Sequence, residues 1–245
     1  MEDKNKNLME KAYWDIKNMI FQQKISPGQK LIYRELSEKL NMSQTPITYA
    51  LGRLEQEGFV ELTPNLGYSV KEIDIKELED LFDIREALEV HAVLLAIKSH
   101  KDENLENLEE AIQKHKEYTP PVYDRKKLVL DANVHLEIAQ MSGNKVLAKQ
   151  LRQLFEHIYL RHRVELMNPS RIHVSSKEHL KILRLIQDRS SSKAVKLIRA
   201  HIRAAKENMT SIHYINLKRN LKEEPFINLL PGKSTKNDIS NCETA

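Results

Sequence analysis

Apolar residues recur every three or four positions through the first part of the chain, which places them on one face of an α-helix. The stretches with this pattern are residues 8–23, 34–40 and 43–57. Gly58 follows the third stretch, where a glycine favours the end of a helix. Two short extended runs, 59–62 and 67–70, come next with a turn between them. Three helices and a hairpin predict a winged helix-turn-helix.

The pattern changes after residue 72, where long amphipathic stretches replace the extended runs. These stretches are 74–100, 102–117, 123–141, 144–167, 171–188 and 190–212. Pro, Gly, Asn and Ser residues separate them, and none alternates as a strand does. The predicted fold is therefore mostly α: a winged helix-turn-helix over 1–72 and an all-α helical bundle over 73–220. The polar tail, 221–245, is expected to be partly ordered at best.

Composition narrows the class of protein. Charged residues make up 30% of the chain and there are only 6 glycines, which favours helices over a sandwich or barrel. No apolar run approaches the roughly 20 residues that span a bilayer, and the first ten residues are too polar for a signal peptide. The single cysteine, Cys242, excludes an internal disulfide framework. We expect a cytoplasmic protein without membrane contact.

The second helix of a helix-turn-helix presents its first residues to the major groove of double-stranded DNA. In this chain those residues are Ser43, Gln44, Thr45, Thr48 and Tyr49. A glutamine pairs with adenine through two hydrogen bonds, and a threonine offers a hydroxyl or a methyl group to thymine. Arg34, Lys39 and Arg53 are expected to contact phosphates, which supply most of the affinity.

The charge of the predicted DNA-binding domain leaves an alternative open. Residues 1–72 hold ten Lys and Arg against ten Asp and Glu, so their net charge is zero. A DNA-binding domain usually has a clearer basic excess. A winged helix used only for protein contacts is therefore the alternative, although a local basic face in a dimer also fits these numbers.

Four residues of the predicted bundle have the chemistry of metal ligands. Asp131 and His135 are four apart and share a helix face. His179 and His201 belong to two later helices, each beside apolar residues. Facing helices commonly hold metals in bundle cores, and three imidazoles with a carboxylate suit zinc, nickel, cobalt, iron or manganese. Ordinary histidines with hydrogen-bonded rings remain the alternative, because the chain holds seven others.

Several motifs resemble those of the GntR family of transcription regulators. They are Ser26-Pro27-Gly28-Gln29-Lys30-Leu31, Arg34-Glu35-Leu36, Ser43-Gln44-Thr45-Pro46, Ala50-Leu51-Gly52-Arg53-Leu54-Glu55 and Gly58-Phe59-Val60. Arg85-Glu86-Ala87-Leu88-Glu89 and the later histidine motifs resemble the FadR-type subfamily. The resemblance covers about residues 8–212. It implies a homodimer in which two winged helices read an inverted repeat.

The resemblance also implies how the bundle functions. Asp131-x3-His135, Glu178-His179 and Ala200-His201-Ile202 match the metal-binding version of the FCD-type effector domain. A divalent transition metal such as Zn, Ni or Mn is expected there, with a small carboxylate effector beside it. Arg85 and Arg161 are candidate anchors for the effector, because arginine binds carboxylates through two hydrogen bonds. A solvated or salt-bridged arginine is the alternative at both positions.

The chain departs from the family at two base-reading positions. Gln44 and Thr48 stand where relatives usually have arginine. We therefore expect a different operator, for example one richer in A·T pairs, or weaker binding. Two other functions stay open: a constitutive winged-helix protein that binds DNA or a partner without an effector, and a metal-dependent hydrolase. No general base can be assigned for the latter, so we expect no enzyme.

Overall fold

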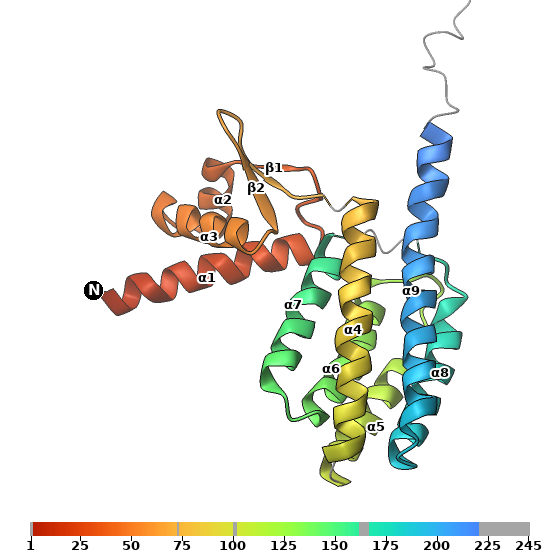
Figure 1. Cartoon of the computed structure of the whole chain (residues 1–245). Helices are drawn as coiled ribbons and strands as arrows, with labels where there is room; N and C mark the ends of the chain where they lie inside the picture. The colour runs from red at the N-terminus through yellow and green to blue at the C-terminus, as the bar shows by residue number, and fades with distance from the viewer. Residues whose placement is uncertain (1, 73, 100–101, 162–166, 221–245) are drawn as a thin grey trace, which may run out of the picture.

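Residues up to Val70 form a small domain of three helices and a sheet (Figure 1). The structure is a computed structural model, and it describes residues 2–72, 74–99, 102–161 and 167–220. The helices of the small domain are α1 (Glu2–Phe21), α2 (Tyr33–Leu40) and α3 (Gln44–Gln56). Its strands are β1 (Lys30–Leu31), β2 (Val60–Thr63) and β3 (Gly67–Val70). The predicted winged helix-turn-helix is confirmed.

The sheet has the antiparallel order β1-β3-β2, so the predicted hairpin of β2 and β3 gains a third strand. Tyr68 of β3 pairs with Leu31 on one side and with Leu62 on the other. The strand β1 was not predicted, because two residues are too few to show the alternation of a strand.

Local backbone geometry sets where helix α3 begins and ends. Asn41 has a φ of 51°, in the left-handed region that commonly follows a helix, and ends α2. Ser43 then takes the N-cap position in an extended conformation, with no capping hydrogen bond from its side chain. Gly58, with a φ of 76°, follows α3 as predicted. Helix α3 therefore begins directly after a tight turn, and its first side chains, Gln44 and Thr45, are exposed.

The second part of the chain is a bundle of helices (Figure 1). They are α4 (Ile75–Ser99), α5 (Asp102–Glu117), α6 (Arg125–Met141), α7 (Lys145–Arg161), α8 (Arg171–Gln187) and α9 (Ser191–Asn220). The long helix α4 packs against α6, α7 and α9, and α8 packs against α5 and α9. The bundle starts as predicted, but α9 continues to Asn220 rather than to residue 212.

Two separate sets of buried apolar residues form the cores of these parts. The first lies between Ala12 and Val70, and the second between Leu78 and Met209. The predicted domain boundary at residue 72 falls between them. The predicted tail, 221–245, lies outside the described residues. In the part that is described, no helix is both long and apolar enough to cross a membrane.

The small domain contacts the bundle mainly through α7. The buried Lys17 of α1 donates to Glu156 Oε2 of α7 at 2.9 Å and to Glu57 Oε2 at 3.2 Å. Glu57 is the C-cap residue of α3. Next to this ion pair, the ring of Phe59 stacks on His157 with centroids 4.7 Å apart. The buried ammonium of Lys17 thus connects the C-terminal end of α3 to the bundle helix α7.

Candidate metal centre

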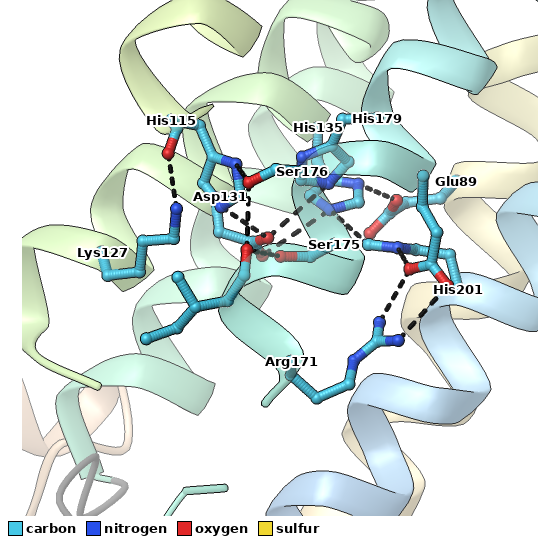
Figure 2. A network of polar contacts seen from close by, with 12 residues as sticks. Glu89, His115, Lys127, Asp131, His135, Arg171, Ser175, Ser176, His179 and His201 are labelled. Carbon is cyan, nitrogen blue, oxygen red and sulfur yellow. Dashed lines mark hydrogen bonds and ion pairs between the residues drawn. The ribbon is translucent and has the colours of Figure 1, made fainter. Parts of the chain in front are cut away.

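The structure brings the four predicted metal ligands together inside the bundle (Figure 2). Asp131 and His135 lie one turn apart on α6, His179 projects from α8, and His201 projects from α9. All four are buried, and their ligand atoms lie within 4.8 Å of one another. Helices that are distant in sequence therefore supply one cluster.

The separations between these atoms suit a shared ion. Nε2 of His135 lies 3.7 Å from Asp131 Oδ2, and Nε2 of His179 lies 3.6 Å from Asp131 Oδ1. Nε2 of His201 lies 3.2 Å from Nε2 of His135. Two donors bound to one ion at about 2.1 Å lie roughly 3–4 Å apart, depending on the angle between them.

Two carboxylates indicate which tautomers the rings of His135 and His201 adopt. Glu89 Oε2 lies 2.5 Å from Nδ1 of His135, and Glu178 Oε2 lies 2.7 Å from Nδ1 of His201. Glu178 accepts the Nδ1–H of His201, and the charge of Glu89 beside Nδ1 of His135 favours a proton on that nitrogen too, so each Nε2 carries a lone pair. The two lone pairs then face each other and repel, unless a cation lies between them. Such carboxylate–histidine pairs are typical of metal sites.

The surroundings of His179 also fit a cation at this place. Its ring is fully buried, yet neither nitrogen has a hydrogen-bond partner among the residues that the structure describes. A buried polar atom without a partner costs about 1–3 kcal/mol. A metal bond to one nitrogen would remove part of that cost, so the donor set fits a divalent transition metal.

The electrostatics of the cluster favour the protonation states that a metal requires. Burial raises the pKa of Asp131, but the imidazoles of His135 and His179 outweigh it and hold this pKa well below its usual range. Burial also lowers the pKa of His179 and of His201, in the latter case against the effect of Glu178. The carboxylate is therefore ionised and these rings are neutral at pH 7, as metal binding demands.

Further buried groups support the ligands. Arg85 of α4 donates from Nε to Glu89 Oε1 at 2.5 Å, and Tyr159 of α7 donates its hydroxyl hydrogen to Asp131 Oδ2 at 3.1 Å. Burial raises the pKa of Glu89, but Arg85 and His135 bring it down to about 2. The sequence interpretation missed Glu89 and Tyr159. A signal existed for Glu89, because it follows Arg85 by one helical turn.

A fourth imidazole, that of His115 of α5, also faces the cluster and was missed (Figure 2). It is fully buried, and its Nε2 lies 3.7 Å from Asp131 Oδ1. Burial lowers the pKa of His115 to about 4. Its sequence signal is weak but real: Leu108 and Ile112 precede it at helical spacing and are buried on the same face.

A small cavity of about 20 Å³ adjoins the cluster. Its polar lining includes Arg85, Asp131, Tyr159, Arg171, His201 and Asn208. This volume accommodates about one water molecule. Nη2 of Arg85 is buried without a hydrogen-bond partner in the described ranges, so it can serve a ligand. Arg85 thus lines the cavity beside the cluster, and its role as an effector anchor stays a prediction.

Two further arginines, Arg161 and Arg171, differ in what the structure describes of them. Arg161, the second predicted anchor, is the last residue of α7, and its side chain lies outside the described part of the chain. Arg171 was not predicted, although it lines the cavity. It donates to Glu178 through Nη1 at 3.3 Å and Nη2 at 2.9 Å, and so orients the carboxylate that holds His201.

The predicted DNA-reading residues lie together on the surface of α3 and at its N-cap. They are Ser43, Gln44, Thr45, Thr48 and Tyr49, and all are exposed. On α2, Lys39 is exposed, and Arg34 forms an exposed ion pair with Glu38 at 2.9 Å. These side chains are available to a ligand outside the protein.

Arg53 differs from the rest of the predicted DNA-binding set. Its guanidinium lies 2.6 Å from Glu10 and 3.2 Å from Glu57, and it stacks over the ring of Tyr13 at 3.8 Å. These contacts hold Arg53 between α1 and α3. A phosphate contact by Arg53 stays a prediction, and it would have to compete with two carboxylates.

Both parts of the chain match known protein families. Residues 8–70 match the family described as bacterial regulatory proteins, gntR family. Residues 80–204 match the FCD domain. The two matches coincide with the small domain and with most of the bundle.

Individual proteins are similar over most of their length. The Nta operon transcriptional regulator of Aminobacter aminovorans is 30% identical over 176 residues, which cover 72% of this chain and 82% of that protein. The HTH-type transcriptional regulator McbR of Escherichia coli is 26% identical over 174 residues, 70% of this chain and 77% of that protein. The solved structure of E. coli McbR/YncC has a TM-score of 0.70 at 22% identity and covers 85% of this chain and 98% of that one.

Proposed function

The chain belongs to the GntR family of bacterial regulatory proteins and contains an FCD domain, and on this premise we propose that a small effector controls its binding to double-stranded DNA. In this proposal a homodimer reads DNA with α3. Asp131, His135, His179 and His201 hold a divalent transition metal such as Zn, Ni or Mn. The effector is a small organic acid bound beside the metal.

The convergence of the four metal donors is the observation that carries the proposal. A bound divalent metal would supply open coordination positions for hard oxygen donors, and a carboxylate is such a donor. Arg85 contributes Nη2, which lacks a partner in the described part of the chain. An arginine and a metal next to one cavity favour a small anion over a neutral ligand.

The size of the cavity supports a switch rather than passive binding. Because about 20 Å³ holds only one water, a larger effector must displace the walls. Tyr159 of α7 is one of these walls and is bonded to Asp131. Glu156 on the same helix accepts from Lys17, which also bonds Glu57 at the end of α3. A ligand that shifts α7 therefore changes the balance between domain arrangements.

The proposed switch can be tested through Lys17. We would measure the DNA affinity of the metal-loaded protein by fluorescence anisotropy, using an operator selected from a random library, across a panel of small carboxylic acids. We expect one class of acid to change the affinity of the unaltered chain by about 5–150-fold, the usual range of allosteric coupling. Lys17→Met should reduce this ratio, because it removes both ion pairs of the connection.

A matched control lies on the same helix. Lys11 of α1 is exposed and, among the described residues, forms a surface ion pair with Asp15, so Lys11→Met should leave the ratio unchanged. The switch is wrong if no acid alters the DNA affinity of the metal-loaded chain. A constitutive winged-helix protein would then be the better description.

A further inference from the structure

We propose that His115 is a fifth protein ligand of the metal, so that four imidazoles and one carboxylate hold the ion. The inference rests on the proposed metal site. It determines how many coordination positions remain for the effector, and therefore which acids can bind.

The distances place His115 as close to the shared carboxylate as two of the other ligands. Its Nε2 lies 3.7 Å from Asp131 Oδ1, against 3.6 Å for His179 and 3.7 Å for His135, each to the nearer oxygen. The rings of His115 and His179 lie edge to face with centroids 4.8 Å apart. Figure 2 shows His115 approaching Asp131 from α5, a helix that holds none of the four predicted ligands.

The hydrogen bonds of Ser176 assign the tautomer of His115. Oγ of Ser176 donates its only hydrogen to the backbone oxygen of Ile172 at 3.0 Å. Oγ also lies 3.3 Å from Nδ1 of His115, so it must accept the Nδ1–H there. Nε2 of His115 then carries a lone pair, and it has no hydrogen-bond partner within the described ranges.

A lone pair that faces a carboxylate inside a protein requires a cation. Nε2 of His115 and Oδ1 of Asp131 are both acceptors in this arrangement, and burial denies them water. A proton or a metal between them would remove the repulsion. The metal is the simpler solution, because the other imidazoles around Asp131 already face the same place.

Hydrogen bonds of Lys127 fix the position of the backbone at His115. Nζ of the buried Lys127 donates to the backbone oxygen of His115 and, at 3.0 Å, to that of Tyr118. The backbone N–H of Lys127 is itself bonded to Asp124 at 2.7 Å, which caps α6. The last turn of α5 is thus fixed to the start of α6, the helix of Asp131.

A fifth protein ligand restricts the effector. A six-coordinate ion held by five protein atoms has one open position, where four protein ligands would leave two. The effector would then bind the metal through one oxygen, and its second carboxylate oxygen would be free for Arg85. We therefore expect monocarboxylates to bind at least as well as acids that chelate a metal through two oxygens.

Proton NMR of the full chain loaded with Co²⁺ counts the ligating rings directly. Each imidazole that binds through Nε2 contributes one exchangeable Nδ1–H signal with a large paramagnetic shift. We expect four such signals in the unaltered chain and three in His115→Gln, each with one cobalt per chain. His173 of α8 is exposed, so His173→Gln should retain all four signals.

The outcomes separate the two proposals. Three signals in the unaltered chain, with one cobalt bound, would overturn the role of His115 and leave the four-ligand site standing. Failure of the unaltered chain to bind cobalt would overturn both. Because the signals are first counted in the unaltered chain, the test does not depend on the folding of a variant. We also expect His115→Gln to weaken Zn²⁺ binding by roughly 10–100-fold or more, since even an outer residue has that effect.

Discussion

The winged-helix domain and the helical bundle carry their polar chemistry in opposite places. In the small domain, the residues from Ser43 to Tyr49, which are predicted to read DNA, are exposed except for Pro46 and Ile47, and the side chain of Arg34 is 88% exposed. In the bundle, the side chains of His179 and Arg85 are almost completely excluded from solvent. The polar residues of the small domain lie on its surface, whereas those of the bundle are enclosed.

This difference determines how much can be inferred about a ligand from the structure of each region. An exposed glutamine or arginine costs nothing when it is unpaired, because water satisfies it. A buried charge or lone pair without a partner is costly, so its presence demands a ligand or a counter-charge. The bundle therefore constrains its ligand through geometry, while the small domain constrains its partner mainly through family membership.

The largest expected effect is the loss of metal from the bundle. Asp131→Ala combined with His179→Ala removes two donors from the cluster and should weaken metal binding by about 10³-fold or more. Losing a single residue that only supports a metal ligand already weakens binding by about 10–100-fold, and here two ligands themselves are lost. Mass spectrometry of protein purified without a chelator or a metal-column tag should find near one metal per chain before the change and none after it. His91→Ala, at an exposed position of α4, is the control. Retention of the metal by the double variant would contradict the site.

The second prediction concerns the stability of the metal-free protein. The folded-state pKa of His115 is about 4, whereas its ordinary value is 6.5. Between these pH values the unfolded chain binds more protons, so the free energy of unfolding falls as the pH drops from 6.5 to 4. The loss attributable to His115 is at most about 3.5 kcal/mol, at about 1.4 kcal/mol per pKa unit.

Urea unfolding of chelator-treated protein at several pH values measures this loss. His115→Gln should reduce the pH dependence between pH 4 and 6.5, because glutamine does not titrate. His173→Gln, at an exposed position, should keep it. An identical pH dependence in His115→Gln and the unaltered chain would show that another group is responsible.

The sequence could predict features that depend on spacing within one helix, but not those that depend on which helices meet. Helices of the bundle were predictable because a buried stripe imposes helical spacing, as Leu78, Phe82 and Val93 do on α4. Asp131 and His135 were predictable as a pair because they share a helix face. Their grouping with His179 and His201 was one of two open interpretations until the resemblance to a family favoured it, since spacing within one helix does not tell which helices meet.

The residues that were missed owe their place to tertiary packing. His115 was one of seven histidines without a distinguishing motif, and only the contact of α5 with α6 turns it toward Asp131. Arg171 reaches the site through Glu178, a neighbour of a ligand rather than a ligand. In the small domain, Arg53 shows the converse: its spacing favoured a phosphate contact, but Glu10 and Tyr13 of α1 hold it.

A third prediction examines the small domain without disturbing the bundle. Gln44→Ala removes an exposed side chain at the start of α3. We expect a loss of about 1–3 kcal/mol in affinity for the selected operator, roughly 5–150-fold, together with weaker preference at one base pair. Gln56→Ala, at the exposed far end of α3, should have little effect. Metal content should stay the same in both variants.

Anisotropy titrations against the operator and against single-base variants of it measure this preference. An affinity loss that is the same for every sequence would assign Gln44 to the DNA backbone rather than to a base. The expectation of an A·T-rich operator would then lose its support.

The smallest expected effect is the change in stability caused by Arg34→Ala, which should differ from that of Arg53→Ala in the same domain. Arg34 is exposed and bonded only to Glu38 in a surface pair, so Arg34→Ala should change the free energy of unfolding by less than about 0.5 kcal/mol. If Arg34 contacts a phosphate, the slope of log affinity against log salt should become shallower by about one. Arg53→Ala should lower the free energy of unfolding by more than Arg34→Ala does and leave the salt slope unchanged, because it removes two ion pairs and the stack on Tyr13. Thermal melts and titrations at several salt concentrations distinguish them. A shallower slope for Arg53→Ala would mean that Arg53 leaves Glu10 and Glu57 when DNA binds, and that α1 moves with it.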